Sequence, residues 1–290
     1  MGVKNTFLCF DIGGTSIKYG IFQENTLILK EETPTNAKSV GGPGILKKLK
    51  ELTERFNKEY VLSAVGISTA GVVNHENGTI QYANENIPNY IGVDFKKFFK
   101  DEFNLNCEVD NDVNCALLGE MHKEYSKQNI VMLTVGTGIG GAMMINGKIY
   151  RGSTNVAGEV GYMNLKEGNF EKIASTSALI KRANEVLKID NLDGRKLVQL
   201  YHENNECAIK EIDTQAKYLA SGIANLAYIL NPNKIILGGG IMENEDIFKK
   251  LISKHLKELL IESLYEVTEI EFAKLGNEAG LYGAYSLVKK

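Results

Sequence analysis

The chain has 290 residues, enough for one large domain or two lobes, and its 43% hydrophobic and 24% charged residues are usual for a globular protein. Its net charge of −3 gives no basic surface for nucleic acid, and no apolar run approaches the roughly 18 residues of a membrane span. The four cysteines form no Cys-x-x-Cys pair, so we predict a reducing compartment and a cytoplasmic location.

The first predicted strand ends in a glycine turn. Apolar runs predict strands over residues 6–11 and 17–22. Between them, Gly13 and Gly14 allow a tight bend and a close approach by a ligand, with the carboxylate of Asp11 before them and the hydroxyl of Thr15 after them. A hairpin turn without a ligand is the simpler interpretation, but it needs neither the acid nor the hydroxyl.

An amphipathic helix is predicted over residues 44–60 and a strand over 61–68, which ends in Thr69-Ala-Gly71. The polar stretch that follows contains five asparagines, one of them Asn84. Loop asparagines often only satisfy turns, but this number also suits a surface that binds hydroxyl groups.

A polar cluster, Asp110 to Asn114, separates a short predicted strand over residues 106–109 from a helix. Such a junction lies at the carboxyl end of a strand and beside the positive end of a helix, where α/β proteins place binding groups. Helix capping is the alternative, because Asp and Asn side chains accept backbone N–H groups there. One residue is enough for a cap, whereas the cluster has three candidates, Asp110, Asn111 and Asp112.

A second glycine turn, Gly136-Thr-Gly-Ile-Gly-Gly141, follows a predicted strand over residues 130–135. A dinucleotide fingerprint of this form must begin a helix, whereas residues 142–150 read as two strands joined at Asn146-Gly147. We therefore predict a second hairpin, with Thr137 and Gly138 at its tip. Two such turns suggest two halves that hold one phosphate chain through backbone N–H groups.

The remaining chain alternates helices, strands and short motifs. Gly158-Glu-Val-Gly-Tyr162 precedes a segment over residues 170–179 that leads into a helix. A strand over 234–237 leads to Gly238-Gly-Gly240, where a flat adenine ring could lie against the backbone. Further helices are predicted over residues 212–230, 246–260 and 277–288.

The order Asp-Ile-Gly-Gly-Thr, Asn-Asp-Val-Asn, Gly-Thr-Gly-Ile-Gly-Gly, Gly-Glu-Val-Gly and Leu-Gly-Gly-Gly resembles the ROK family (repressor, open reading frame, kinase) over nearly the whole chain. The resemblance implies the α/β fold of actin-like ATPases and sugar kinases, related to ribonuclease H, with two lobes around a central cleft. The expected lobes are residues 1–117 completed by 277–290, and residues 118–276. The family also implies ATP with Mg²⁺, a sugar substrate and a homodimer.

Within the family the chain looks most like bacterial N-acetylmannosamine kinases, through motifs such as Gly66-Ile-Ser-Thr-Ala-Gly-Val-Val73 and Ile87-Pro-Asn-Tyr90. This implies phosphorylation of the C6 hydroxyl of N-acetylmannosamine, in sialic acid catabolism. Glucokinases, other N-acetylhexosamine kinases and β-glucoside kinases share most of the same site and stay alternatives. The acceptor class is a sugar alcohol group in each case.

Site residues carry over from the resemblance position by position. Asp112 is expected to be the catalytic base that takes the proton of the attacking hydroxyl, and Asn111 a sugar ligand. The sugar pocket is expected to include Gly71, Asn84, Asn111, Asp112, Glu159, Tyr162 and Glu171. The nucleotide is expected to contact Asp11, Gly13, Gly14, Thr15, Thr137, Gly138 and Gly239, with Asp11 the best candidate to hold Mg²⁺.

One position departs from the family pattern. Many ROK proteins have a histidine three positions after the glutamate of Gly-Glu-x-Gly and then a cysteine-rich zinc loop, whereas this chain has Tyr162 and no cysteine between Met163 and Phe170. We therefore expect no zinc. Tyr162 could contact the sugar or simply pack in place of the zinc loop. Glu159 and Glu171 could bind sugar or lie on an exposed surface. Cys115 is expected to be a buried neighbour of the site.

Two other classes compete with a kinase. ROK repressors carry a DNA-binding helix-turn-helix ahead of the kinase-like part, and Asp11 already belongs to the first phosphate turn, so we expect no such domain and no nucleic-acid partner. A catalytically silent sugar sensor would not need the carboxylate of Asp112.

Overall fold

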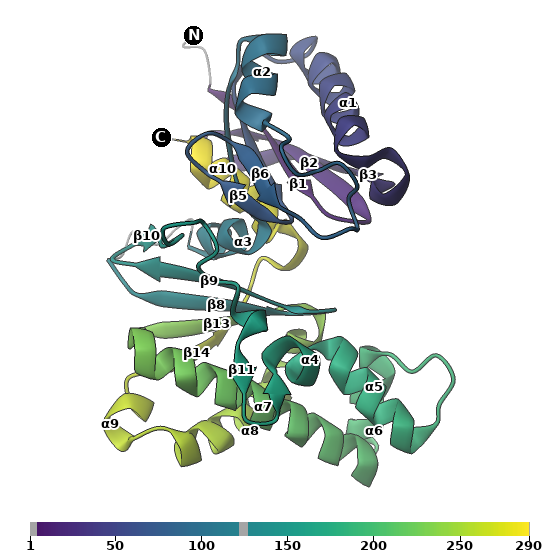
Figure 1. Ribbon diagram of the computed structural model, residues 1–290, viewed down its shortest axis with the longest axis vertical. Coiled ribbons are helices and arrows are strands. Elements are labelled where there is room, and N and C mark those ends of the chain that lie inside the picture. The colour runs from purple at the N-terminus through teal and green to yellow at the C-terminus, as the bar shows by residue number, and fades with distance from the viewer. Residues whose placement is uncertain (1–4, 122–126, 290) are drawn as a thin grey trace. The chain divides into compact units, whose positions relative to one another are not determined.

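The computed structural model describes residues 5–121 and 127–289 (Figure 1). The chain forms two compact units. Unit 1 contains residues Met1–Tyr125, Arg151–Val156 and Asn277–Lys290, and unit 2 contains Ser126–Tyr150 and Ala157–Gly276. Among the described residues, no helix is long and apolar enough to pass through a lipid bilayer.

Unit 1 has a five-stranded sheet in the order β3-β2-β1-β4-β7. The first three strands form an antiparallel meander, and β4 and β7 run parallel to β1. Because Ile12 pairs with Thr69 and Thr69 pairs with Asn111, the three parallel strands end at one edge of the sheet. The strands are β1 Thr6–Ile12, β2 Ser16–Gln23, β3 Thr26–Pro34, β4 Leu62–Thr69 and β7 Asn106–Asn111.

The alternation of side chains along β1 divides the core of unit 1 into two clusters. Leu8, Phe10 and Ile12 face helices α1 (Ala37–Asn57) and α2 (Phe95–Phe103). Phe7 and Cys9 point the other way, toward α10 (Ala279–Val288). The sheet is therefore covered on both faces, as its near-continuous burial requires.

Helix α10 packs closely against α3 (Asp112–Glu120) through glycines. A methyl group built on Gly283 would lie 1.8 Å from the carbonyl oxygen of Cys115, and one on Gly119 would lie 2.3 Å from that of Ala279. Only glycine permits this spacing. Helix α10 therefore holds α3, with Asp112 on its first turn, against the rest of unit 1.

Unit 2 repeats the same strand layout in the order β10-β9-β8-β13-β14, with an antiparallel hairpin followed by parallel strands. Its strands are β8 Ile130–Val135, β9 Ile139–Ile145, β10 Lys148–Ile149, β13 Lys234–Gly238 and β14 Glu269–Phe272. The helices lie together on one side of this sheet (Figure 1). They are α4 Phe170–Ala174, α5 Thr176–Leu187, α6 Gly194–His202, α7 Glu206–Leu230, α8 Glu245–Leu259 and α9 Glu262–Tyr265.

Shorter elements complete the described chain. Two small hairpins pair β5 with β6 and β11 with β12. Three single turns of 3₁₀ helix, η1 to η3, lie in unit 2 and at the entry to α10. Their bounds are β5 Val72–Asn74, β6 Thr79–Tyr82, β11 Asn164–Leu165, β12 Gly168–Asn169, η1 Val160–Tyr162, η2 Gly240–Glu243 and η3 Gly276–Glu278.

The strands and helices expected from the sequence are confirmed, with different ends for several helices. α7 begins at Glu206 instead of residue 212, because the side chain of Asn205 accepts the N–H of Ala208 at 3.0 Å and caps the helix there. α1 begins at Ala37 and passes a kink at Gly41, whose φ is 59°. The segment expected as a helix from residue 277 starts as the 3₁₀ turn η3 and becomes α10 at Ala279.

Candidate functional site

The carboxyl ends of β1, β4 and β7 bring together three of the polar positions predicted from the sequence. Asp11 pairs with Ser68 across β1 and β4, and Thr69 pairs with Asn111 across β4 and β7. The Ser68 hydroxyl donates to Asp11 Oδ1 at 2.7 Å, and the Lys18 ammonium lies 3.7 Å from Asp11 Oδ2. This edge is where α/β sheets generally bind their ligands.

Asp11 is a carboxylate in a confined place. A methyl group on Gly280 of α10 would lie 2.5 Å from its carboxyl carbon, so the helix backbone lies directly against it. Removal from water raises the pKa of the Asp11 carboxyl, while the Ser68 hydrogen bond and the Lys18 charge oppose that rise. A single hard oxygen donor of this kind fits Mg²⁺, which keeps several waters and is commonly held by one or two carboxylates plus substrate phosphates.

The first glycine turn follows directly. The Gly13 N–H donates to the Ser16 carbonyl at 3.0 Å, and the Thr35 hydroxyl donates to the Gly13 carbonyl at 2.7 Å. Gly14 and Thr15 are exposed, and a methyl group on Gly14 would meet no atom within 4 Å. The backbone at the tip of this turn is therefore open to a ligand.

The junction between β7 and α3 gives each of its polar residues a separate task. Asn111 is the N-cap of α3, because its Oδ1 accepts the N–H groups of Val113 at 2.9 Å and Asn114 at 3.2 Å. Its Nδ2 donates to the Gly71 carbonyl at 3.0 Å and to Asp112 Oδ1 at 2.9 Å. Asp112 itself is exposed on the first turn of α3. A carboxylate at a helix N-terminus is stabilised in its ionised form.

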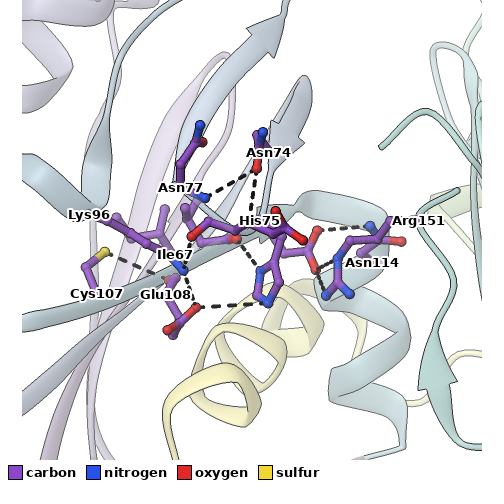
Figure 2. Close-up of polar contacts among 12 residues, drawn as sticks. Ile67, Asn74, His75, Asn77, Lys96, Cys107, Glu108, Asn114 and Arg151 are labelled. Carbon is purple, nitrogen blue, oxygen red and sulfur yellow. Dashed lines mark hydrogen bonds and ion pairs between the residues drawn. The ribbon is translucent and has the colours of Figure 1, made fainter. Parts of the chain in front are cut away.

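Asp110 is the buried member of this cluster, and its partner was not predicted from the sequence. Its side chain is 1% exposed, and its Oδ2 accepts hydrogen bonds from Arg151 Nε at 3.0 Å and from Arg151 Nη2. Oδ1 accepts the Asn111 N–H at 2.8 Å and Asn114 Nδ2 at 3.0 Å. Asn114 and Arg151 are labelled in Figure 2. Asp110 and Arg151 are 41 positions apart in the sequence, so no local pattern links them.

A second set of polar contacts supports the middle of β7, just before Asp110 (Figure 2). His75 Nδ1 lies 3.0 Å from the Val109 carbonyl, and Lys96 Nζ lies 2.8 Å from Glu108 Oε2. These groups fix the strand that ends in Asp110 and Asn111.

Gly71 and Asn84 lie in neighbouring loops of unit 1. Gly71 has a φ of 100°, and a methyl group there would lie 2.7 Å from the carbonyl oxygen of Tyr82. The side chain of Asn84 accepts the N–H of Asn86 at 3.1 Å. Asn111 thus contacts Gly71 directly, whereas the side chain of Asn84 accepts a hydrogen bond within its own turn.

In unit 2 the second glycine turn joins β8 to β9, with Thr137 exposed at its tip. The carboxylate of Glu171, at the start of α4, accepts the N–H of Ile139 at 3.1 Å. Gly239, which follows β13 and precedes η2, has a φ of 105°, and a methyl group there would lie 2.2 Å from the Val135 carbonyl. The predicted nucleotide residues of unit 2 therefore lie at the adjacent ends of β8 and β13.

Glu159 comes just before η1 and is exposed. Partial removal from water, and then the charge of nearby Glu171, raise the pKa of its carboxyl. A methyl group on Gly161, two residues after Glu159, would lie 3.5 Å from Glu171 Oε2, so this part of the chain lies beside Glu171. Unit 2 thus gathers Glu159, Glu171 and the glycine turn.

The sequence model that describes the ROK family matches residues 7–290 of this chain. The chain belongs to the ROK family. Its relatives include an uncharacterized protein of Clostridium perfringens, 43% identical with 96% of each chain covered. A glucokinase of Halalkalibacterium halodurans is 31% identical, covering 97% of this chain and 94% of its own. An N-acetyl-D-glucosamine kinase of Pasteurella multocida is 30% identical, covering 96% and 97%.

Solved structures of ROK proteins have the same fold. A ROK family protein of Streptococcus pneumoniae, solved with sucrose, has a TM-score of 0.84 at 30% identity and covers 97% of this chain and 96% of its own. A Listeria monocytogenes protein, provisionally named as an N-acetylmannosamine kinase, has a TM-score of 0.86 at 26% identity and covers 98% and 99%. The predicted α/β actin-like ATPase fold and the predicted enzyme class, a sugar kinase, are confirmed.

Tyr162, at the position where many ROK proteins have a zinc-binding histidine, is 67% exposed in η1. The described residues contain no group of three or more His, Cys, Asp or Glu side chains placed to hold a metal ion. That the protein contains no zinc stays a prediction.

Cys115 follows Asp112 by one helical turn and is fully buried. Its thiol is directed to the carbonyls of Ile67 and Asp110. Burial raises the pKa of this thiol well above its ordinary value, which suits an inert neighbour of the site.

Proposed function

We propose that the protein transfers the γ-phosphoryl group of ATP to the C6 hydroxyl of N-acetylmannosamine, as a cytoplasmic step of sialic acid catabolism. The observation that carries the proposal is the β7–α3 junction, where Asp112 is exposed on the first turn of α3 and its neighbour Asn111 is held by Gly71. A carboxylate so placed suits a general base, and the cap suits a side chain whose position must be fixed.

Phosphoryl transfer requires mainly positioning and charge stabilisation from the protein. Asp112 would accept the proton of the C6 hydroxyl, and Asn111, Gly71, Asn84, Glu159, Tyr162 and Glu171 would bind and orient the sugar. The turn at Gly13-Gly14-Thr15, through the N–H groups of Gly14 and Thr15, and the turn at Thr137-Gly138 would donate to phosphate oxygens, with Gly239 beside the adenosine. The bound Mg²⁺ would neutralise charge on the phosphates, and the carboxylate of Asp11 would hold it, in part through water.

The choice of N-acetylmannosamine is supported by the sequence motifs and by the likeness to the Listeria protein. Glucose is the second candidate, because a relative named as a glucokinase is 31% identical. N-acetylglucosamine is favoured by the 30% identity to the Pasteurella enzyme, and a β-glucoside remains a further alternative. We also propose a homodimer without zinc, whose partners are small molecules only.

A coupled assay of ADP release, with ATP and Mg²⁺, tests this function. The acceptors are N-acetylmannosamine, N-acetylglucosamine, glucose, mannose and a β-glucoside, compared by kcat/KM. Elemental analysis of protein purified without a chelator tests for zinc, and sedimentation measures the oligomeric state.

We expect the highest kcat/KM with N-acetylmannosamine. A preference for glucose would contradict the substrate and leave the role of Asp112 intact. No turnover with any acceptor would contradict the kinase activity itself and favour a sugar sensor.

A further inference from the structure

Glu171 contacts the glycine turn of unit 2, although its sequence motif predicts only a sugar ligand. Its Oε2 accepts the N–H of Ile139 at 3.1 Å. A methyl group on the adjacent Gly138 would lie 2.2 Å from the same oxygen, so a side chain at that position would displace the carboxylate. The contact of the Glu171 carboxylate with this turn therefore depends on the glycine at Gly138, in addition to any contact with phosphate.

The chain after Glu171 holds the other side of the turn. The Thr176 N–H donates to the Gly136 carbonyl at 2.9 Å, and the Thr176 hydroxyl donates to the Val135 carbonyl at 3.3 Å. Residues 171 to 176 thus bind both strands that meet at Thr137. A shift of α4 would move this turn.

Helix α4 is in turn fixed to the core of unit 2. The ring of Phe170 is fully buried, and a methyl group on Gly222 of α7 would lie 2.3 Å from it. The side chain of Gln215, also from α7, donates to the Ala174 carbonyl, and Arg182 Nη1 donates to the Ile173 carbonyl at 2.5 Å. The backbone on both sides of Glu171 is therefore immobilised, and its carboxylate is directed to the turn.

We infer that Glu171 is a shared residue of the sugar and nucleotide sites and couples the binding of the two substrates. The sugar half of this inference rests on the proposed function. A sugar hydroxyl that donates to the Glu171 carboxylate would restrict that side chain and, through the Ile139 N–H, would order the turn that meets the phosphates. Linkage then requires the nucleotide to strengthen sugar binding by the same factor, typically about 5-fold to 150-fold.

The decisive test is binding of the non-hydrolysable analogue AMPPNP with Mg²⁺, measured by isothermal titration calorimetry without any sugar. A residue that only binds sugar has no effect on this affinity. We expect Glu171→Ala to weaken AMPPNP binding roughly tenfold, the usual value of a hydrogen bond to a charged group. Glu171→Gln should restore most of the affinity, because its amide oxygen can accept the same N–H. Glu167→Ala, an exposed glutamate of the β11–β12 turn, is the matched control and should bind as wild type.

Gly222→Ala tests the positioning of Glu171 without changing a group that touches either substrate. It should displace Phe170 and weaken AMPPNP and sugar together, with circular dichroism as the check on folding. Unchanged AMPPNP affinity in Glu171→Ala would overturn the inference. Absence of sugar phosphorylation by wild type would contradict the proposed function alone, since the AMPPNP titration is read without sugar. Absence of AMPPNP binding to wild type would overturn both.

The coupling itself is measured by titrating the preferred sugar with and without AMPPNP. Wild type should bind sugar at least about fivefold more tightly with the analogue present. Glu171→Ala should lose that gain. Equal coupling in wild type and Glu171→Ala would contradict the shared role.

Discussion

Three successive residues with short carboxylate or amide side chains, Asp110, Asn111 and Asp112, have different surroundings. Asp110 is buried and pairs with Arg151, Asn111 caps α3, and Asp112 is exposed. The capping interpretation is therefore correct for Asn111, and Asp112 Oδ1 also accepts the Val113 N–H at 3.0 Å. The remaining two carboxylates differ in access to solvent, which is the property that separates a structural group from one that can meet a substrate.

Asp112→Asn is the residue-scale test of catalysis. Asparagine keeps the size of the side chain but cannot take the proton of the attacking hydroxyl. We expect kcat to fall by about 10²–10⁴ while AMPPNP and sugar still bind, measured by ADP release and by calorimetry. Near wild-type turnover would show that another group is the base.

Asp11→Asn tests the electrostatic cost of the site. In the folded protein burial raises the pKa of the Asp11 carboxyl above its ordinary 3.8, so the folded state binds this proton more tightly than the unfolded chain. The cost of ionisation is absent below pH 3.8, grows as the pH rises through the folded pKa, and is complete above it. At neutral pH we expect the substitution to raise the free energy of unfolding by about 1 kcal/mol, with lower kinase activity.

Urea unfolding at neutral pH and near pH 3.8 measures the difference between wild type and Asp11→Asn. The difference should shrink at the acidic pH, where the folded protein holds Asp11 mainly in its uncharged form. A gain that is the same at both pH values would exclude ionisation of Asp11 as its cause.

At the scale of elements, the contact between Arg151 and Asp110 attaches residues 151–156 to the β7–α3 junction. Arg151→Gln leaves a buried carboxylate without its cation, so we expect a loss of roughly 3 kcal/mol in the free energy of unfolding and a lower kcat. The double variant with Asp110→Asn should lose less, because the uncompensated charge is gone. Arg195→Gln, an exposed arginine of α6, should change urea unfolding by less than about 0.5 kcal/mol. Equal losses in the single and double variants would contradict this account.

Elements with a clear period could be predicted from the sequence, and those set by tertiary contacts could not. β1 and β8 are buried apolar runs beside glycine turns, which made both hairpins visible. β3 alternates partly buried and exposed side chains at the edge of its sheet, and its sequence gave no separate signal. The start of α7 depends on the cap by Asn205. The sequence has many asparagines, and nothing local distinguishes this one from those that lie in turns.

The same distinction holds for the site. Asp112, Asn111 and the two turns lie in short contiguous motifs, so their types and spacing indicated phosphate and sugar chemistry. Arg151 and the contact of Glu171 with Ile139 depend on residues that are 41 and 32 positions from their partners. Such pairings exist only once the sheets have formed, and no local pattern encodes them.

At the scale of the molecule, both units have the same strand layout, with a glycine turn at the same place in each. Unit 1, however, is assembled from separate stretches of chain, because α10 supplies part of its core. Leu281, Ala284 and Tyr285 are almost fully buried against Phe7, Cys9, Phe22 and Ala64.

Removal of residues 277–290 should therefore unfold unit 1 and leave unit 2 folded. Hydrogen exchange measured by mass spectrometry should show loss of protection in β1, β2 and β4, with protection kept in β8, β13 and β14. Protection that is lost in both sheets, or kept in both, would show that the two units do not fold as described.

The place of α10 in the chain has a consequence for synthesis. The ribosome makes β1, β2 and β4 early, and it completes α10 only after the whole of unit 2. At translation rates of about 5–20 residues per second, the interval is on the order of 10 to 45 seconds. During that time the face formed by Phe7, Cys9 and Ala64 has no cover, so we expect the nascent chain to be held by chaperones until α10 emerges and docks.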